Sequence, residues 1–140
     1  LKCLTDLRFR EAITGWRALC EALEAHAKLE EEEVFRAYAA LGERPRGAGL
    51  ELFAADHTSF RKVVNECAGV LAELSALDGE SDDLRAEMVV RLKPFLRLRG
   101  VLEHHGLREQ LHLYPALDLS LEKTERQQLA KRLSASEAAS

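Results

Sequence analysis

The sequence predicts an all-α protein, an up-and-down helical bundle followed by a short C-terminal helix. Only three prolines and eight glycines interrupt 140 residues, and apolar residues recur at spacings of three and four rather than in alternation. A chain of this length supports one hydrophobic core. We therefore expect a single domain over residues 1–140, with the bundle over about 7–118 and the short helix over about 120–134.

The first long helix is expected over residues 6–41. Trp16, Leu19 and Leu23 begin an apolar stripe along one of its faces, and Gly42 ends the helix. The Gly- and Pro-rich segment GERPRGAG that follows predicts a loop.

The second helix is expected over residues 50–77. His57 is the single polar member of its stripe. The apolar members of that stripe are Phe53, Phe60, Val64, Cys67, Leu71 and Leu74. The unbroken alternation of three- and four-residue steps predicts a helix with one continuous buried face.

The run DGESDD predicts a turn into a third helix, which is expected to reach about Asp118. Pro94 falls inside this helix, so we expect a kink or a break there. Ser120 is placed to cap the short amphipathic helix LEKTERQQLAKRL, and the small-residue tail SASEAAS is expected to fray.

Composition argues against several classes of function. A formal charge of -4 gives no reason to expect a nucleic-acid partner, and no apolar run approaches the roughly 18 residues that a membrane span needs. Without a secretion-signal layout, the cytoplasm is the expected location. The distant cysteines Cys3, Cys20 and Cys67 are expected to be buried or incidental thiols. No nucleophile and base stand at a recognisable spacing, so a conventional enzyme is not predicted.

Two segments of the chain repeat one pattern. LEAHAKLEEEEVFRAY begins at residue 23 and LEHHGLREQLHLYPAL at residue 102, an offset of 79. Residues four apart share one face of a helix, so His26 and Glu30 occupy inward positions where the stripe otherwise carries leucine. His105 and Glu109 occupy the same positions in the second copy.

These side chains predict a metal site inside the bundle. An ionised carboxylate buried without a partner costs several kcal/mol, and neither stripe carries an inward Lys or Arg. In an antiparallel bundle the first and third helices are parallel, so the two copies face each other with the second helix's histidine between them. Imidazole and carboxylate together suit iron, manganese or zinc. The predicted ligands are His26, Glu30, His57, His105 and Glu109.

Two alternatives remain open at this point. Glu109 and His112 form the E-x-x-H spacing of ferritin-like di-iron oxidases, but the motif occurs once where that class needs two. His104 and His112 are not shared between the repeats and are not predicted as ligands. A metal-free helical interaction module, with a groove that takes a partner helix, is the second alternative.

The ordered motifs HAKLEE, DHTSF and HHGLREQLHLYPAL resemble those of the hemerythrin-like, or HHE cation-binding, family over roughly residues 7–135. The resemblance implies a four-helix bundle with a non-haem di-iron centre that is open to dioxygen, nitric oxide or peroxide. Sensing, storage or detoxification are the functions implied. It also implies that the terminal ligands are His26, His57 and His105, and that the bridging carboxylates are Glu30 and Glu109.

Two features depart from the family pattern. The first helix of the family and its histidine have no counterpart, so a homodimer or an N-terminal helix before Leu1 is expected to cover the open apolar side. Arg61 stands where oxygen-carrying members have a further histidine. This replacement removes a ligand and brings a cation near the cluster, so oxygen carriage is not expected.

Overall fold

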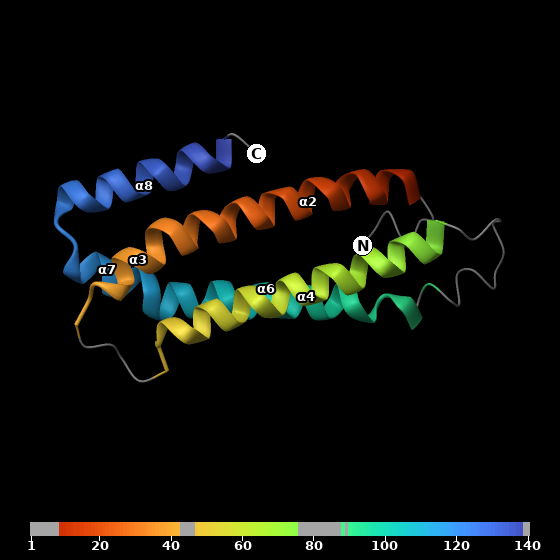
Figure 1. Ribbon diagram of the computed structural model, residues 1–140, viewed down its shortest axis with the longest axis horizontal. Coiled ribbons are helices and arrows are strands. Elements are labelled where there is room, and N and C mark those ends of the chain that lie inside the picture. Colours follow the sequence, from red (N-terminus) through yellow and green to blue (C-terminus); the bar gives the residue numbers. More distant parts are fainter. Residues whose placement is uncertain (1–8, 43–46, 76–87, 89, 139–140) are drawn as a thin grey trace.

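The computed structural model describes residues 9–42, 47–75, 88 and 90–138, and every regular element in these ranges is helical. Three long helical segments run lengthwise beside one another, with a fourth helix at the C-terminal end (Figure 1). The predicted all-α bundle is therefore confirmed. None of the described helices has both the length and the apolar character that crossing a membrane demands.

The first segment consists of α2 (Phe9–Leu29), the π-helical turn η1 (Glu30–Val34) and α3 (Phe35–Ala39). It matches the predicted first helix closely, although the expected start at residue 6 lies outside the described residues. The second segment is α4 (Leu50–Ser75), which runs antiparallel to it (Figure 1). The predicted end of this helix, at residue 77, also lies outside the described residues.

The third segment consists of α6 (Lys93–Arg108), the π-helical turn η2 (Glu109–Leu113) and α7 (Tyr114–Ser120). A turn at Leu92 separates α6 from the helical residues before it, and Pro94 lies in the first turn of α6. Proline is tolerated there because its missing N–H would have no partner within the helix. The predicted break is confirmed, whereas the predicted DGESDD turn falls outside the described residues.

The C-terminal helix α8 (Lys123–Ala138) differs from its prediction in three ways. Ser120 is the last residue of α7, and the cap of α8 comes from Glu125, whose side chain accepts the backbone N–H of Glu122 at 2.9 Å. The helix also continues to Ala138 through the segment that was expected to fray, because alanine, serine and glutamate are compatible with helical backbone. It is only weakly amphipathic, since Leu129 is its single buried side chain over residues 123–132.

The core consists of two apolar clusters, one on each side of a buried polar layer. The larger cluster contains Ala27, Phe60, Val63, Cys67, Leu71, Leu74, Met88, Phe95 and Leu98. The smaller cluster contains Val34, Phe35, Tyr38, Phe53, Leu113, Leu117 and Leu129. The predicted stripe of α4 is correct except at Val64, which is half-buried while its neighbour Val63 is fully packed. Cys67 is a buried free thiol and Cys20 a half-buried one, while Cys3 lies outside the described residues.

An apolar groove of about 400 Å³ lies beside α2 and α6. Trp16 and Phe95 meet in it edge to face, with ring centroids 5.6 Å apart. Its other apolar lining residues include Ala12, Leu19, Leu71, Leu98 and Leu102. The expectation that a second copy or a further helix covers an apolar surface of this kind stays a prediction.

Candidate metal centre

The repeat in the sequence is also a repeat in the backbone. Phe35 N–H donates to the carbonyl of Glu30, and Tyr114 N–H donates to the carbonyl of Glu109. In both copies, therefore, one helical turn contains an extra residue at the same point. In an α-helix a step of four residues overshoots one turn by about 40°. A wider turn offsets this drift, which keeps both glutamates and the residues four positions later on the inward face.

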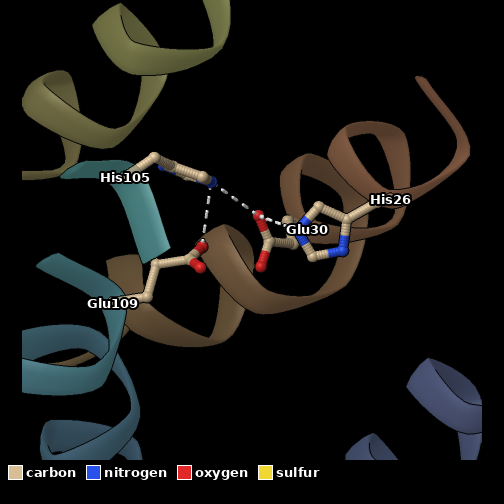
Figure 2. Close-up of side chains that lie close together, drawn as sticks. All are labelled: His26, Glu30, His105 and Glu109. Carbon is tan, nitrogen blue, oxygen red and sulfur yellow. Dashed lines mark ion pairs between the residues drawn. The ribbon is translucent and has the colours of Figure 1, made fainter. Parts of the chain in front are cut away.

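Two helical segments bring their histidine and glutamate pairs together (Figure 2). His26 and Glu30 come from the first segment, and His105 and Glu109 from the third. One donor atom from each of the four residues lies within 4.8 Å of the others. Glu30 is fully buried, while His105 and Glu109 are 4% and 5% exposed, so three of these groups lie in the interior.

The Oε2 atom of Glu30 is at the middle of the cluster. It lies 3.4 Å from His26 Nε2 and 3.3 Å from His57 Nε2. It also lies 3.4 Å from His105 Nε2, which is in turn 3.2 Å from Glu109 Oε1. The Nε2 atoms of His57 and His105 are 3.2 Å apart. All five residues singled out by the sequence therefore lie together, with nitrogen and oxygen atoms facing one another.

The other oxygen of Glu30 has a separate partner. Tyr114 donates its hydroxyl hydrogen to Glu30 Oε1 at 3.0 Å. In the repeat, Tyr114 corresponds to Phe35, whose ring stacks on His57 with centroids 5.1 Å apart and planes at 26°. One copy thus supplies a hydroxyl and the other a flat apolar surface. The periodicity argument missed Tyr114, although the exchange of phenylalanine for tyrosine between the copies was a visible signal.

The two glutamates differ in protonation. Burial opposes ionisation of Glu30, but hydrogen bonds with His105, His57 and Glu109 outweigh it and hold the Glu30 pKa well below its usual range. Burial and the ionised Glu30 raise the pKa of Glu109 far above its usual range. Burial also opposes the charged form of His57, yet its bonds to Glu30 and Glu31 raise its pKa. Without a metal ion, protons hold this cluster together.

The donor set fits a divalent transition-metal ion. Three imidazoles and two carboxylates match the ligands that iron, manganese and zinc accept. Glu109 Oε1 and His105 Nδ1 are buried and form no hydrogen bond among the described residues. Buried polar atoms are nearly always satisfied, so an oxygen of Glu109 that faces the Nε2 atom of His105 at 3.2 Å without a hydrogen bond is a position that a cation would complete.

The remaining candidate residues lie outside the cluster. His104 is exposed and contacts Arg108 Nη2 at 2.6 Å. His112 is half-buried and does not belong to the group whose donor atoms converge. Arg61 pairs with Glu24 and Glu31 at 2.9 and 2.8 Å, so the expected cation lies next to the cluster and is bound by these two carboxylates.

Comparison of the chain with known protein families, with curated proteins and with solved structures finds no match in any of the three. The resemblance to the hemerythrin-like family therefore stays a prediction. The case for a metal centre depends on the geometry of the five residues.

Proposed function

We propose that this chain is a hemerythrin-like, non-haem iron-binding protein of the cytoplasm, with a pair of irons open to dioxygen, nitric oxide or peroxide. The observation that carries the proposal is the convergence of three histidines on one oxygen of Glu30, within 3.4 Å, in the interior of a helical bundle. The doubled motif and its doubled π-helical turn support it, since such turns occur frequently at functional sites.

The roles of the five side chains follow from their donor atoms. His26, His57 and His105 would bind through Nε2, the atom that each directs at Glu30. Glu30 and Glu109 would supply the negative charge, from two helical segments that face each other. Bound iron would supply Lewis acidity and electron exchange with a small oxygen- or nitrogen-containing ligand.

The protein around the site determines what reaches it. The side chain of His57 is fully buried and that of His105 is 5% exposed, whereas that of His26 is 41% exposed. Access is therefore most open beside His26. On the opposite side, Phe35 and Phe60 pack against the ring of His57. An apolar interior of this kind admits small neutral molecules and excludes bulky charged ones. Sensing, storage or detoxification are consistent with such a site.

The metal-free interaction module remains the competing function. It requires that the polar layer be stable through protons alone, and the apolar groove beside α2 and α6 would be its binding surface. The burial of two glutamates beside three imidazoles favours the metal site, because one kind of ion can bind all five donor groups.

Metal analysis of protein purified without chelator, followed by anaerobic titration with ferrous iron, tests the proposal. We expect about two irons per chain and ligand-to-metal absorption in the near ultraviolet after oxidation. His105→Ala and Glu109→Ala should each abolish most of the binding. His104→Ala and His112→Ala are matched controls, because these histidines lie in the same helical segment but outside the cluster. Iron near zero in the wild type, with helicity unchanged in His105→Ala, would instead favour the interaction module.

A further inference from the structure

We propose that Glu31 and Asp56 are positioning residues of this metal centre, each accepting the Nδ1–H of one buried histidine so that its Nε2 lone pair faces the ion. Arg61 holds the first carboxylate and Arg108 the second. The inference rests on the proposed metal-binding function and adds two residues that the ligand set does not include.

The first of these arrangements is fully formed. His57 Nδ1 lies 2.8 Å from Glu31 Oε1, on the side of the imidazole away from the cluster. Arg61 donates to the same oxygen from Nη1 at 2.8 Å and also binds Glu24 through Nε at 3.0 Å. Because the guanidinium is anchored at two carboxylates, Glu31 is fixed in place and remains an ionised acceptor.

The second arrangement has the same three chemical parts. His105 Nδ1 lies 3.7 Å from Asp56 Oδ2, and Arg108 Nη1 lies 3.1 Å from that oxygen. Both facing atoms are buried and form no hydrogen bond among the described residues. A movement of about 1 Å brings them to hydrogen-bond distance. Asp56 is the carboxylate that faces this nitrogen, so it is the acceptor that satisfies both atoms.

These contacts decide which nitrogen of each imidazole carries the proton. A neutral histidine has one N–H, and an ionised carboxylate at Nδ1 places it there. The Nε2 atoms of His57 and His105, 3.2 Å apart, then present lone pairs to each other and to Glu30. Electron-rich atoms at this distance repel unless a proton or a metal ion lies among them. Glu31 and Asp56 therefore direct the Nε2 atoms of both histidines toward the position that a metal ion would occupy.

Zinc is a suitable probe because it accepts the same donors and has no redox chemistry. The dissociation constant is measured by competition with a chromophoric chelator for wild type, Glu31→Ala, Asp56→Ala and Glu31→Gln. Loss of an outer carboxylate typically weakens metal binding about 10- to 100-fold, and we expect each alanine variant to fall in this range. Glu31→Gln keeps an acceptor for Nδ1–H and should recover part of the affinity. Glu66→Ala is the matched control, because Glu66 is also a partly exposed carboxylate paired with an arginine, Arg97, but lies outside the cluster and its supporting contacts; it should stay within about twofold of wild type.

Nitrogen-15 NMR of the imidazoles gives a second readout that a purely structural role would not change. In zinc-loaded wild type, His57 and His105 should carry a proton on Nδ1 and bind through Nε2. Ligation through Nδ1, or alanine variants at 31 and 56 that bind zinc as tightly as Glu66→Ala, would overturn the inference while leaving the metal site intact. Failure of the wild type to bind zinc or iron would overturn the proposed function as well. Should Glu31→Ala not fold, the wild-type tautomers decide the question.

Discussion

The hydroxyl of Tyr114 donates a hydrogen bond to Glu30 Oε1 at 3.0 Å, across 84 residues of sequence. It thereby joins the two helical segments that carry the repeated motif, at the carboxylate on which three histidines converge. In the metal-free protein, this bond supplies a donor to Oε1 of Glu30, while the imidazoles contact the other carboxylate oxygen, Oε2.

Tyr114→Phe removes this hydroxyl and leaves a buried carboxylate oxygen short of a donor. We expect the free energy of unfolding of the metal-free protein to fall by about 1–3 kcal/mol. Zinc should offset part of this loss, because a bound ion compensates the negative charge that remains buried on Glu30. Urea unfolding with chelator and with zinc checks the result. Tyr38→Phe, which removes a hydrogen bond of 2.8 Å to the carbonyl of Ala48 and none to the five candidate ligands, should lose the same amount in both conditions.

Glutamine substitutions should separate the two glutamates. Glu109 is held protonated by burial and by ionised Glu30, so Glu109→Gln mimics its neutral form and should leave the metal-free stability nearly unchanged at a pH of about 4.5 or below, where the unfolded chain also keeps much of this group protonated. Glu30 is ionised and accepts several hydrogen bonds, so Glu30→Gln should destabilise the metal-free protein by about 2 kcal/mol or more. Both variants should lose most of their zinc affinity. Equal loss of stability in the two would contradict the assigned protonation states.

The raised pKa of Glu109 also predicts a dependence of stability on pH. A carboxyl group whose pKa is higher in the folded state stabilises the fold fully below its unfolded value, near 4.5, and this contribution is lost as pH rises toward the folded value. Relative to Glu109→Gln, metal-free wild type should therefore lose stability as pH increases from about 4.5. Urea unfolding of both proteins with chelator present, at pH steps from 4.5 upward, measures the difference. Parallel curves would show that the pKa of Glu109 is not raised in the folded protein.

The thiol of Cys67 should be inert in the folded protein. Burial raises its pKa to about 11, so little thiolate forms near neutral pH. In a variant with Cys3→Ser and Cys20→Ser, labelling by a thiol reagent should be at least about tenfold slower in the native protein than in urea. A variant that keeps only Cys20, which is half-buried, should show a smaller difference. Rapid native labelling of Cys67 would indicate that α2 and α4 separate readily at this level.

The regular parts of the fold could be predicted because apolar residues spaced three and four apart determine which helical face is buried. The same reasoning found the five converging side chains, since a polar residue within such a stripe is directed inward. It could not find Glu31 or Asp56. Both stand beside a predicted ligand in sequence but on the flank of their helix, where periodicity assigns charged residues to solvent.

The π-helical turns were also beyond prediction. Their sequences, EEEEV and EQLHL, share little beyond the initial glutamate and an apolar last residue, so no local pattern specifies the wider turn. Pro115 removes a backbone donor after the second turn, but Arg36 stands at the equivalent place in the first. We attribute both turns to the burial of the initial glutamate together with the apolar residue four positions later. The cap of α8 was mispredicted for a simpler reason, because Ser120 still belongs to the preceding helix.

Helix α4 belongs to neither copy of the repeat, yet residues 56, 57 and 61 within one short stretch of it contact both copies. A shift of α4 by one helical turn, about 5.4 Å, would therefore break its contacts with both copies of the repeat at once. Helix α4 therefore sets the axial alignment of the first and third helical segments. Changes in the length of the connection before Leu50 should be tolerated only if they keep that alignment.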